Sequence, residues 1–356
     1  MEIGIFTFGD IGTNPHTGQT INAPERLRNI TEEIILADQV GVDVYGLGEH
    51  HRPDYAVSAV AVALAAAATQ TKHIRFTSTV SVLSSDDPVR VFQQFATLDG
   101  LSLGRAEIIA GRGAFIESFP LFGYDLDDYD ALFIEKLSML LEINKQEHVD
   151  WPGSKHTQTL DGLGVYPRPV QDPLPIWMAV GGTPQSSARA ASLGLPAAFA
   201  LILGGEWARL APLLQLYHQT GHAAGQDASR LKTSLNAHAF VHESMQKAID
   251  IYYPAHSARM GALGRERGMP AQSRETFTAF CGPKGGYFIG GPTEVAEKIL
   301  AAHEALRFDR ILLQFGVGVI EHRTMLEAIE ILGTRVIPEV RRGLSRQGPL
   351  KTPVYT

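Results

Sequence analysis

The sequence predicts an α/β protein built as a closed (β/α)8 barrel, and three observations lead to this prediction. Short apolar runs alternate with longer amphipathic runs, which is typical of strand–helix units around a parallel sheet. Eight runs of each kind follow one another, whereas an open doubly wound sheet usually has fewer strands. The length of 356 residues is also normal for a single barrel.

The expected strands are apolar or β-branched and are bounded by glycine, proline or polar residues. They cover residues 2–8, 43–48, 74–82, 105–110, 176–180, 197–203, 232–241 and 310–315. Each is followed by a helical pattern, and Pro88 marks one helix start, after Asp86 and Asp87 as candidate caps. The helices cover residues 24–40, 58–70, 88–101, 129–144, 184–193, 206–224, 293–306 and 324–341.

Two stretches interrupt the alternation and predict insertions after the fourth and seventh strands. Residues 146–175 are rich in proline and glycine, which favours an irregular insertion with a small hairpin. Residues 261–286 form a second long excursion that contains several basic residues. Since no linker divides the chain, we expect one domain over residues 1–345 and a loose tail over 346–356.

Composition and missing motifs exclude several classes of function. The net charge of −7 provides no basic surface for nucleic acid. Cys281 is the only cysteine, which excludes an intrachain disulfide and a multi-cysteine zinc site. Residues 56–68 are too few to cross a bilayer, and the N-terminus lacks a signal-peptide pattern. We therefore expect a soluble cytoplasmic protein that binds neither nucleic acid nor membrane. The G-x-S-x-G, Walker and H-E-x-x-H motifs are also missing.

The end of the second strand carries the first candidate site. Glu49, His50 and His51 directly follow a buried strand, at the end of a barrel where catalytic groups lie. Histidine is suited to proton transfer near neutral pH, although such a pair can also simply fix a loop. Because adjacent side chains of a strand face opposite ways, only one histidine should face the mouth unless the backbone turns first. A metal site is disfavoured, since adjacent histidines rarely chelate one ion.

The ends of the fourth and fifth strands predict an anion-binding site. Arg112 lies between two glycines, and its planar guanidinium suits phosphate oxygens. After the fifth strand, Gly182, Thr183, Pro184 and two serines open a helix, whose free N–H groups attract anions. The hydroxyls of Thr183, Ser186 and Ser187 are expected to add donors to this site. Taken singly, a surface turn and ordinary helix capping explain these patterns equally well. The two strands are neighbours in a barrel, so both ends can converge on one phosphate.

The order and spacing of these stretches resemble the bacterial luciferase-like family of flavin-dependent monooxygenases. The resemblance runs from Ile3 to about Val340 and is carried by residues 46–51, 77–82, 87–90, 98–105, 111–113 and 181–194. It implies the barrel described above and a flavin cofactor, either FMN or, in one branch of the family, the deazaflavin F420.

The resemblance also implies a role for each candidate residue. His50 aligns with an active-site histidine that acts as acid or base beside the flavin. Thr79 and Val80 align with a non-prolyl cis peptide that supports the flavin ring. Residues 261–286 align with a mobile loop over the barrel mouth. The residues that align with the phosphate site are Arg112, Gly182, Thr183 and Ser186. Gly182 replaces a carboxylate of luciferase, so light emission and a long-chain aldehyde substrate are not expected.

The expected activity is that of a two-component monooxygenase. Reduced FMN comes from a separate flavin reductase, and oxygen is inserted into a small organic substrate that the sequence does not identify. One alternative is an F420-dependent dehydrogenase, because an acidic cofactor tail would suit Arg265, Arg267, Arg274 and Lys284. The other alternative is a flavin-binding protein without turnover, which would need neither His50 nor a loop over the mouth. No metal is expected, and the resemblance predicts a homodimer.

Overall fold

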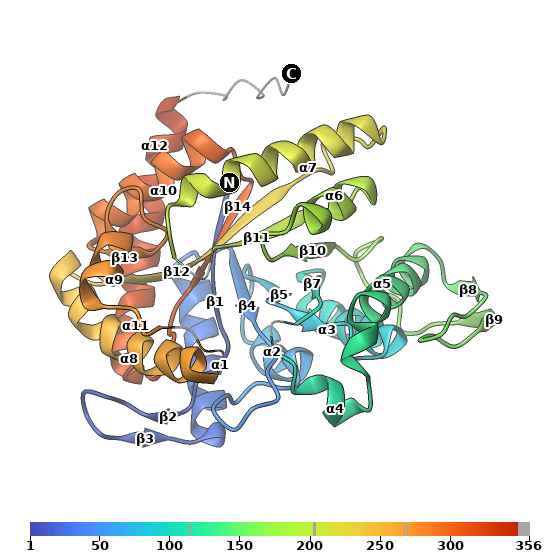
Figure 1. Ribbon diagram of the computed structural model, residues 1–356, viewed down its shortest axis with the longest axis horizontal. Helices are drawn as coiled ribbons and strands as arrows, with labels where there is room; N and C mark the ends of the chain where they lie inside the picture. Colours follow the sequence, from blue (N-terminus) through green and yellow to red (C-terminus); the bar gives the residue numbers. More distant parts are fainter. Residues whose placement is uncertain (114, 202–203, 267, 269, 348–356) are drawn as a thin grey trace.

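Eight parallel strands close into a barrel, which confirms the predicted fold (Figure 1). The computed structural model describes residues 1–113, 115–201, 204–266, 268 and 270–347, and the strand count refers to these residues. Around the barrel the order is β1, β4, β5, β7, β10, β11, β12 and β14, which pairs with β1 again. The strands are β1 (Glu2–Thr7), β4 (Val44–Leu47), β5 (Arg75–Ser78), β7 (Ala106–Gly111), β10 (Ile176–Val180), β11 (Ala197–Leu201), β12 (Thr233–Val241) and β14 (Arg310–Gln314).

The register around β1 explains why a glycine lies in the middle of a buried strand. Gly4 pairs with Val44 on one side and with Leu312 on the other. A Cβ atom at Gly4 would lie 2.5 Å from the carbonyl oxygen of Val44 and 2.6 Å from Leu312 Cδ2. The barrel can therefore close at this point only around a residue without a side chain.

Helices cover the outer face of the barrel, and their starts follow the capping signals of the sequence. Asp87 accepts a hydrogen bond from the Arg90 N–H at 3.0 Å, which confirms the start predicted at Pro88. Asn22 caps the first helix in the same way, through the Glu25 N–H at 3.0 Å. The outer helices are α1 (Ala23–Gln39), α2 (Val60–Ala68), α3 (Pro88–Ser102), α5 (Tyr129–Lys145), α6 (Pro184–Ser192), α7 (Ala211–Ala223), α10 (Pro292–Leu306), α11 (His322–Ile331) and α12 (Ile337–Gln347).

Two predicted elements are divided in the structure. The strand expected over 74–82 consists of β5 and the separate β6 (Ser81–Val82), which pairs with β7. The helix expected over 324–341 contains a π-helical turn at Leu332–Val336. Pro338 has no N–H for the regular bond four residues back, and a Cβ at Gly333 would lie 2.3 Å from Val40 Cγ2. A widened turn accommodates both constraints.

Both predicted insertions are present, and the first contains the expected hairpin, β8 (His148–Trp151) and β9 (Leu160–Gly164). The second is more regular than expected, because helices replace most of the predicted loop over 261–286. Phe277 is fully buried there, so this part packs as core. Pro254 lies inside the first of these helices and interrupts the helical signal in the sequence. The elements of this insertion are α8 (Met245–Glu266), α9 (Arg274–Cys281) and β13 (Phe288–Gly290).

Several short elements have no counterpart in the prediction. They are β2 (Gly12–Thr13), β3 (Thr20–Ile21), α4 (Ser118–Phe122) and the 3-10 turn at Leu126–Asp128. The helix expected over 206–224 begins with a 3-10 turn at Trp207–Leu210. No helix within the described residues is long and apolar enough to cross a bilayer. Most of the predicted tail over 346–356 lies outside the described residues, which end at 347.

Buried charges fill the barrel interior at the amino-terminal ends of the strands. Arg310 Nη2 donates to Glu107 Oε2 at 3.0 Å, and Arg310 Nε donates to Glu2 Oε2 at 2.8 Å. The Arg310 guanidinium also lies 4.3 Å from the centre of the Trp177 ring. In barrels this end contributes to stability, whereas the opposite end carries the functional groups.

Candidate active site

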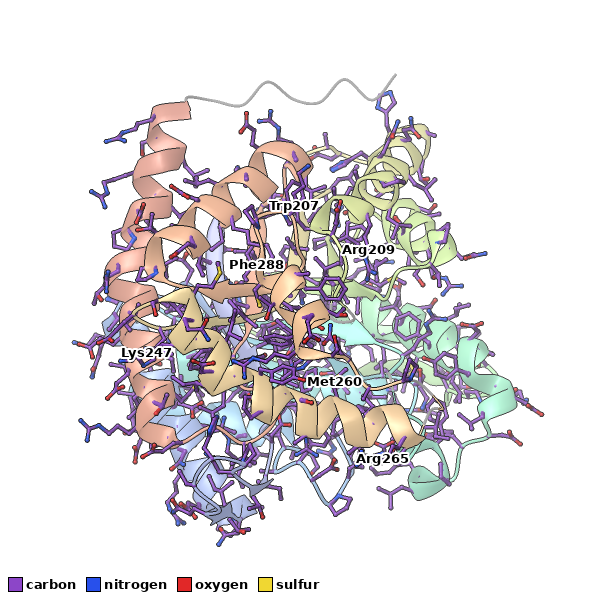
Figure 2. All side chains as sticks on the ribbon, turned by 60° about the vertical axis from the view of Figure 1, so that its left-hand side comes forward. Trp207, Arg209, Lys247, Met260, Arg265 and Phe288 are labelled. Carbon is purple, nitrogen blue, oxygen red and sulfur yellow. The ribbon has the colours of Figure 1, made fainter. Side chains whose placement is uncertain are left out.

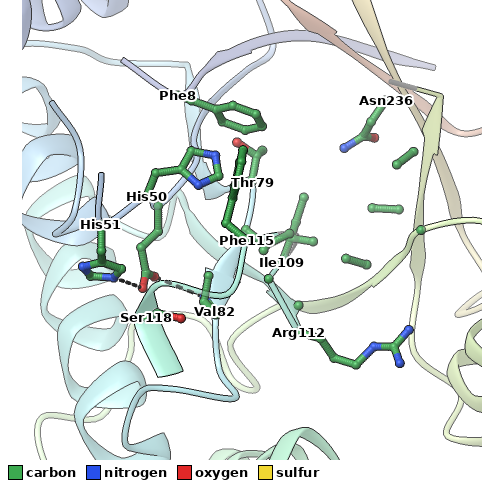
Figure 3. Close-up of a pocket in the computed structure, with 18 of the residues that line it drawn as sticks. Phe8, His50, His51, Thr79, Val82, Ile109, Arg112, Phe115, Ser118 and Asn236 are labelled. Carbon is green, nitrogen blue, oxygen red and sulfur yellow. Dashed lines mark hydrogen bonds and ion pairs between the residues drawn. The ribbon is translucent and has the colours of Figure 1, made fainter. Parts of the chain in front are cut away.

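A cavity of about 320 Å³ lies at the carboxyl ends of the barrel strands (Figure 3). Its walls come from every part of the barrel between β1 and β12. Phe6 and Phe8 form one side, and Asn236 comes from β12, which lies two strands from β1. All of the candidate catalytic and ring-contacting residues of the sequence, His50, Thr79 and Val80, line this cavity, and so does Arg112. The location agrees with the rule that barrel function sits at this end.

His50 is enclosed by three aromatic rings. The ring centres of Phe8, Tyr55 and Phe115 lie 4.6, 4.5 and 4.7 Å from that of His50. Its backbone N–H donates to Val57 O at 2.9 Å, which fixes the chain just after β4. The Nε2 atom of His50 is buried and has no hydrogen-bond partner within the described residues. The hydrogen-bonding capacity of this atom is therefore unused in the structure.

Burial keeps the imidazole of His50 neutral. Desolvation is the largest of the causes that together lower the pKa of His50 to about 3, and the others are the charges of the nearby Arg52, His51 and Arg259. A neutral imidazole has one N–H donor and one acceptor nitrogen. Near neutral pH, His50 can therefore donate or accept a hydrogen bond, and it takes up a proton only transiently.

His51 also lines the cavity, because the backbone turns away from the strand after Leu47. Its Nε2 atom lies 2.9 Å from Glu49 Oε1, and the other carboxylate oxygen accepts the Val82 N–H at 3.1 Å (Figure 3). The hydrogen bond to Glu49 raises the pKa of His51. His51 and Glu49 thus join the loops after β4 and β5, which is a structural task that His50 does not share.

Thr79 and Val80 are joined by a cis peptide bond, as the family resemblance implies. Glycines of the neighbouring strands make room for this segment. A Cβ at Gly46 would lie 2.5 Å from Thr79 Cγ2, and one at Gly111 would lie 2.6 Å from Val80 Cγ2. The glycine before Arg112 is therefore required by the close approach of Val80.

Arg112 and helix α6 meet, as the sequence predicts. The Arg112 Nη2 group donates to Ser186 Oγ at 3.0 Å, and the Thr183 hydroxyl donates to the same oxygen at 2.9 Å. Thr183 is also the N-cap of α6 and accepts the Ser186 N–H at 3.4 Å. On its other side, Arg112 Nη1 contacts Asp130 Oδ1 at 2.6 Å. A guanidinium, two hydroxyls and the positive end of a helix thus occupy one edge of the cavity.

The backbone before α6 leaves open space for a ligand. Gly182 has a φ of +110°, and no atom lies within 4 Å of a Cβ built on Gly181 or Gly182. The first N–H groups of a helix have no partner within the helix, but Pro184 has no N–H and the Ser186 N–H donates to Thr183, so Gln185 is left to supply this donor. One expectation is corrected here. The Ser187 hydroxyl donates to Leu213 O at 2.8 Å and is fully buried, so it does not belong to the anion site.

Several wall residues have no counterpart in the sequence prediction. Ser118 Oγ is buried without a partner within the described residues, as is Oγ1 of Thr79, which the sequence did predict. Asn236 accepts the Ser234 hydroxyl on Oδ1 at 2.8 Å, which leaves its amide N–H2 group toward the cavity. Polar residues at alternate positions of β12, namely Ser234, Asn236 and His238, were the signal for an inward-facing polar row.

The chemistry of the donor set fits an anionic, partly aromatic cofactor. No group of three or more metal-ligating side chains occurs within the described part of the chain. The cavity instead combines aromatic walls, three unpartnered polar atoms and a cationic edge. These features fit a molecule with a flat ring at one end and a phosphate at the other.

The fold and the cavity define the class: a (β/α)8 barrel with its candidate active site at the carboxyl ends of its strands. The chain belongs to the luciferase-like monooxygenase family, whose family model matches residues 1–308. This match confirms the family that the sequence motifs resemble.

Three relatives illustrate the relationship. The uncharacterized protein y4vJ of Sinorhizobium fredii is 27% identical over 334 residues, which cover 90% of this chain and 93% of y4vJ. Monooxygenase RslO1 from Streptomyces bottropensis superposes with a TM-score of 0.81 at 22% identity, covering 95% of this chain and 99% of that chain. The oxygenating constituent of 3,6-diketocamphane monooxygenase from Pseudomonas putida, in complex with FMN, gives a TM-score of 0.74 at 18% identity and covers 96% and 99%.

These structural likenesses show the fold alone, since their sequence identities are low. Solved structures of the same fold also include F420-dependent enzymes. The cofactor of this chain therefore has to be argued from its own residues.

Proposed function

We propose that the protein is an FMN-dependent monooxygenase that receives reduced FMN from a separate flavin reductase and inserts oxygen into a small organic substrate. One observation carries this proposal: the cavity joins the cationic edge at Arg112 and α6 to a buried, neutral His50 with an unpartnered Nε2. FMN has a dianionic phosphate at one end and a ring system at the other, and it would match both ends. When bound in its reduced form, FMN supplies the electrons that activate oxygen.

The phosphate end of the site would hold FMN through charge and fixed geometry. Arg112 offers the guanidinium, Thr183 and Ser186 offer hydroxyls, and the start of α6 offers its positive end with the N–H of Gln185. Asp130 pairs with Arg112 in the structure and would compete with a phosphate for it. Because the Asp130 side chain is 65% exposed, it can turn toward solvent at small cost.

The ring end of the site would orient the cofactor and keep water out. Thr79, Val80 and the aromatic residues around His50 form this part of the wall. His50 would accept a proton or share a hydrogen bond at Nε2, as a neutral imidazole. Its dry surroundings would also protect reactive oxygen species from water, which is a general requirement of such chemistry.

Flavin titrations test the proposal directly. The protein is titrated with FMN and with riboflavin, in the oxidised state and after anaerobic reduction, and binding is followed by flavin fluorescence or absorbance. We expect FMN to bind more tightly than riboflavin, and reduced FMN more tightly than oxidised FMN. Equal affinities for the two oxidation states would contradict the supply of reduced FMN by a reductase. Equal affinities for FMN and riboflavin would contradict the phosphate site.

The same titration with F420 tests the closest alternative, an F420-dependent dehydrogenase. The basic cluster that favoured this alternative is weaker in the structure than in the sequence. Arg274 pairs with the Asp250 carboxylate, while Arg265 and Lys284 are exposed, and Arg267 lies outside the described residues. Tight binding of F420 with weak binding of FMN would replace our proposal. Binding of FMN with no reaction of the bound reduced form with oxygen would favour a flavin-binding protein without turnover.

We further propose that the chain forms a homodimer through α2 and α3. Val62 and Leu101 on these helices are 69% and 46% exposed, and they border a shallow apolar groove. Sedimentation or light scattering should give twice the mass of the 38.7 kDa chain. V62D should shift the protein toward the monomer, whereas the control L163D, at an exposed leucine of β9, should not. A monomer in the unaltered protein would contradict this proposal.

A further inference from the structure

Helix α8 reaches the walls of the His50 site through two arginine residues. Figure 2 shows α8 running across the face of the molecule, with Met260 and Arg265 labelled along its C-terminal half. This helix is part of the insertion after β12, so it is far from His50 in the sequence. Two contacts nevertheless link the helix to the chain segment that follows His50, residues 51–55.

The first contact is made by Arg259 of α8. Its Nε donates to Asp10 Oδ1 at 2.7 Å, and its Nη2 donates to the carbonyl oxygens of Ile11 at 3.0 Å and Asp54 at 2.9 Å. Nη1 also pairs with the Asp54 carboxylate. The Arg259 side chain is only 12% exposed. All three nitrogen atoms of this buried guanidinium are hydrogen-bonded, so its position and its plane are both fixed.

The second contact joins Arg52 to Glu266 near the C-terminal end of α8. The two Nη groups of Arg52 donate to the two carboxylate oxygens of Glu266 at 3.0 and 2.7 Å. Arg52 Nε donates to Asp54 Oδ1 at 3.2 Å. A bidentate pair of this kind holds the plane of the guanidinium as well as its position.

Each of these arginines covers one of the aromatic rings that enclose His50. The guanidinium of Arg259 lies 4.8 Å from the centre of the Tyr55 ring, and that of Arg52 lies 5.0 Å from the Phe115 ring. Both rings contact His50 directly, at 4.5 and 4.7 Å between ring centres. Two adjacent walls of the histidine, whose ring centres lie 6.3 Å apart, are therefore backed by cations, and both cations are held by α8.

We propose that Arg259 and the Arg52–Glu266 pair are positioning residues for His50, which hold Tyr55 and Phe115 against the imidazole and keep it dry and neutral. This inference rests on the proposed function in that it assigns a purpose to the neutral state of His50. It goes beyond that function, because it assigns roles to residues that touch neither the phosphate site nor the reacting end of the cavity.

The charges around His50 act in the same direction as its burial. The groups facing it are His51, Arg52 and Tyr55 from its own segment and Arg259 from α8. The two arginines lower the pKa of His50, because a nearby positive charge disfavours a second one. The carboxylates of Asp10, Asp54 and Glu266 bind these arginines and partly offset their charge.

The test uses the full-length protein and two variants that differ in their risk to folding. R52Q removes a partly exposed arginine and leaves Glu266 near the surface. Removing Arg259 alone would leave the buried Asp10 carboxylate without its partner, so the double variant D10N/R259Q removes both charges together. The matched control is R274Q. Arg274 also pairs with a carboxylate of α8, Asp250, and covers a tyrosine ring, but it does not contact the His50 site.

The first readout is the titration of the His50 ring by ¹H–¹⁵N NMR, with the signal assigned by its loss in H50Q. In the unaltered protein and in R274Q, the ring should stay mostly neutral down to about pH 4. In R52Q and in D10N/R259Q, the pKa of His50 should rise from about 3 by roughly one pH unit or more, toward its ordinary value. Changed ring-current shifts should show that the imidazole has moved relative to its aromatic neighbours.

The second readout is the reaction of bound reduced FMN with oxygen, followed by stopped flow across a pH series. In both variants, the fall of this rate at acidic pH should move to higher pH, and FMN affinity should change little. A merely structural role for these residues would lower the melting temperature but leave this pH dependence and the ring titration unchanged. That result, in R52Q alone or in both variants, would overturn the proposal.

The experiments distinguish a failure of the proposed role of His50 from a failure of the positioning role of Arg52 and Arg259. If H50Q keeps the full rate, the proposed role of His50 fails. The ring titration still measures whether Arg52 and Arg259 control the state of the imidazole, because NMR needs neither cofactor nor substrate.

Discussion

Arg112 offers the sharpest test of the proposed cofactor site. R112A removes the guanidinium that contacts Ser186 Oγ at 3.0 Å at the start of α6. Thr183 still caps the helix through the Ser186 N–H, so the backbone of the site should survive the change. Only the charged donor is lost, and the effect should therefore fall on ligands that carry a phosphate.

The expected loss follows from the exposure of the side chain. A hydrogen bond to a charged group contributes about 1.5–3 kcal/mol. The Arg112 side chain is 24% exposed, so solvent screens part of this interaction and we take the lower half of the range. About 1.5–2 kcal/mol corresponds to a loss of roughly 10- to 30-fold in FMN affinity. Riboflavin carries no phosphate and should lose less than about twofold.

Parallel fluorescence titrations with FMN and riboflavin measure this difference. R189A is a matched control, because it removes one positive charge from the last turn of the same helix α6. A similar loss for FMN and riboflavin in R112A would refute the phosphate assignment, and so would an equal effect of R189A. D130N should act in the opposite direction. It removes the carboxylate that competes for Arg112, so FMN affinity should rise by roughly 1.5- to 5-fold at low salt.

The remaining predictions concern catalysis and stability. H50Q should slow the reaction of bound reduced FMN with oxygen by about 100-fold or more, as measured by stopped flow. FMN affinity, measured by titration, should change less than about twofold. An unchanged rate would remove the histidine from the mechanism. G4A should lower the free energy of unfolding by about 1–3 kcal/mol, since its Cβ would lie 2.5 Å from a carbonyl oxygen of the next strand. The control G100A, with no atom within 4 Å of the new Cβ, should be neutral or stabilising in the same urea titration. Stability should also fall as the pH drops below 6.5, by about 1.4 kcal/mol per pH unit for each histidine kept neutral by burial. The folded-state pKa of such a group lies below its unfolded value, so the unfolded chain binds the proton first. A flat unfolding free energy between pH 6.5 and 5 would contradict this assignment for His50, His238 and His256.

Sequence and structure agree most closely at the proposed phosphate site. Arg112 and Thr183 are each followed or preceded by glycines, and both lie just after predicted strands. Since neighbouring strands of a parallel barrel end at the same rim, local pattern and barrel topology were enough to predict their meeting. The position of the Ser187 hydroxyl was not predictable in this way. Its hydroxyl donates to Leu213 O instead of facing the site, and only the packing of α7 against α6 decides this.

Local sequence thus determined the elements whose signal lies within about ten residues: the eight strands, the capped helix starts and the motifs at the strand ends. The periods of two and 3.6 residues and the capping residues are short-range physical constraints, so they are readable from the chain alone. Tertiary packing, and not local sequence, produced the division of the strand over 74–82 and the helix α8. In α8 the local signal of Pro254 points against a helix, and the helix forms because Tyr252 and Ala255 beside it are buried against the barrel.

Only the tertiary structure decided how His50 behaves. The sequence placed a histidine at the end of a strand and gave no reason for its charge state. Its neutrality comes from three rings and two arginines that arrive from β1, from the segments that follow β4 and β7, and from α8. Desolvation and Coulomb interactions depend on distances in space, and residues as far apart in the chain as Phe8 and Arg259 set them. No local pattern contains that information.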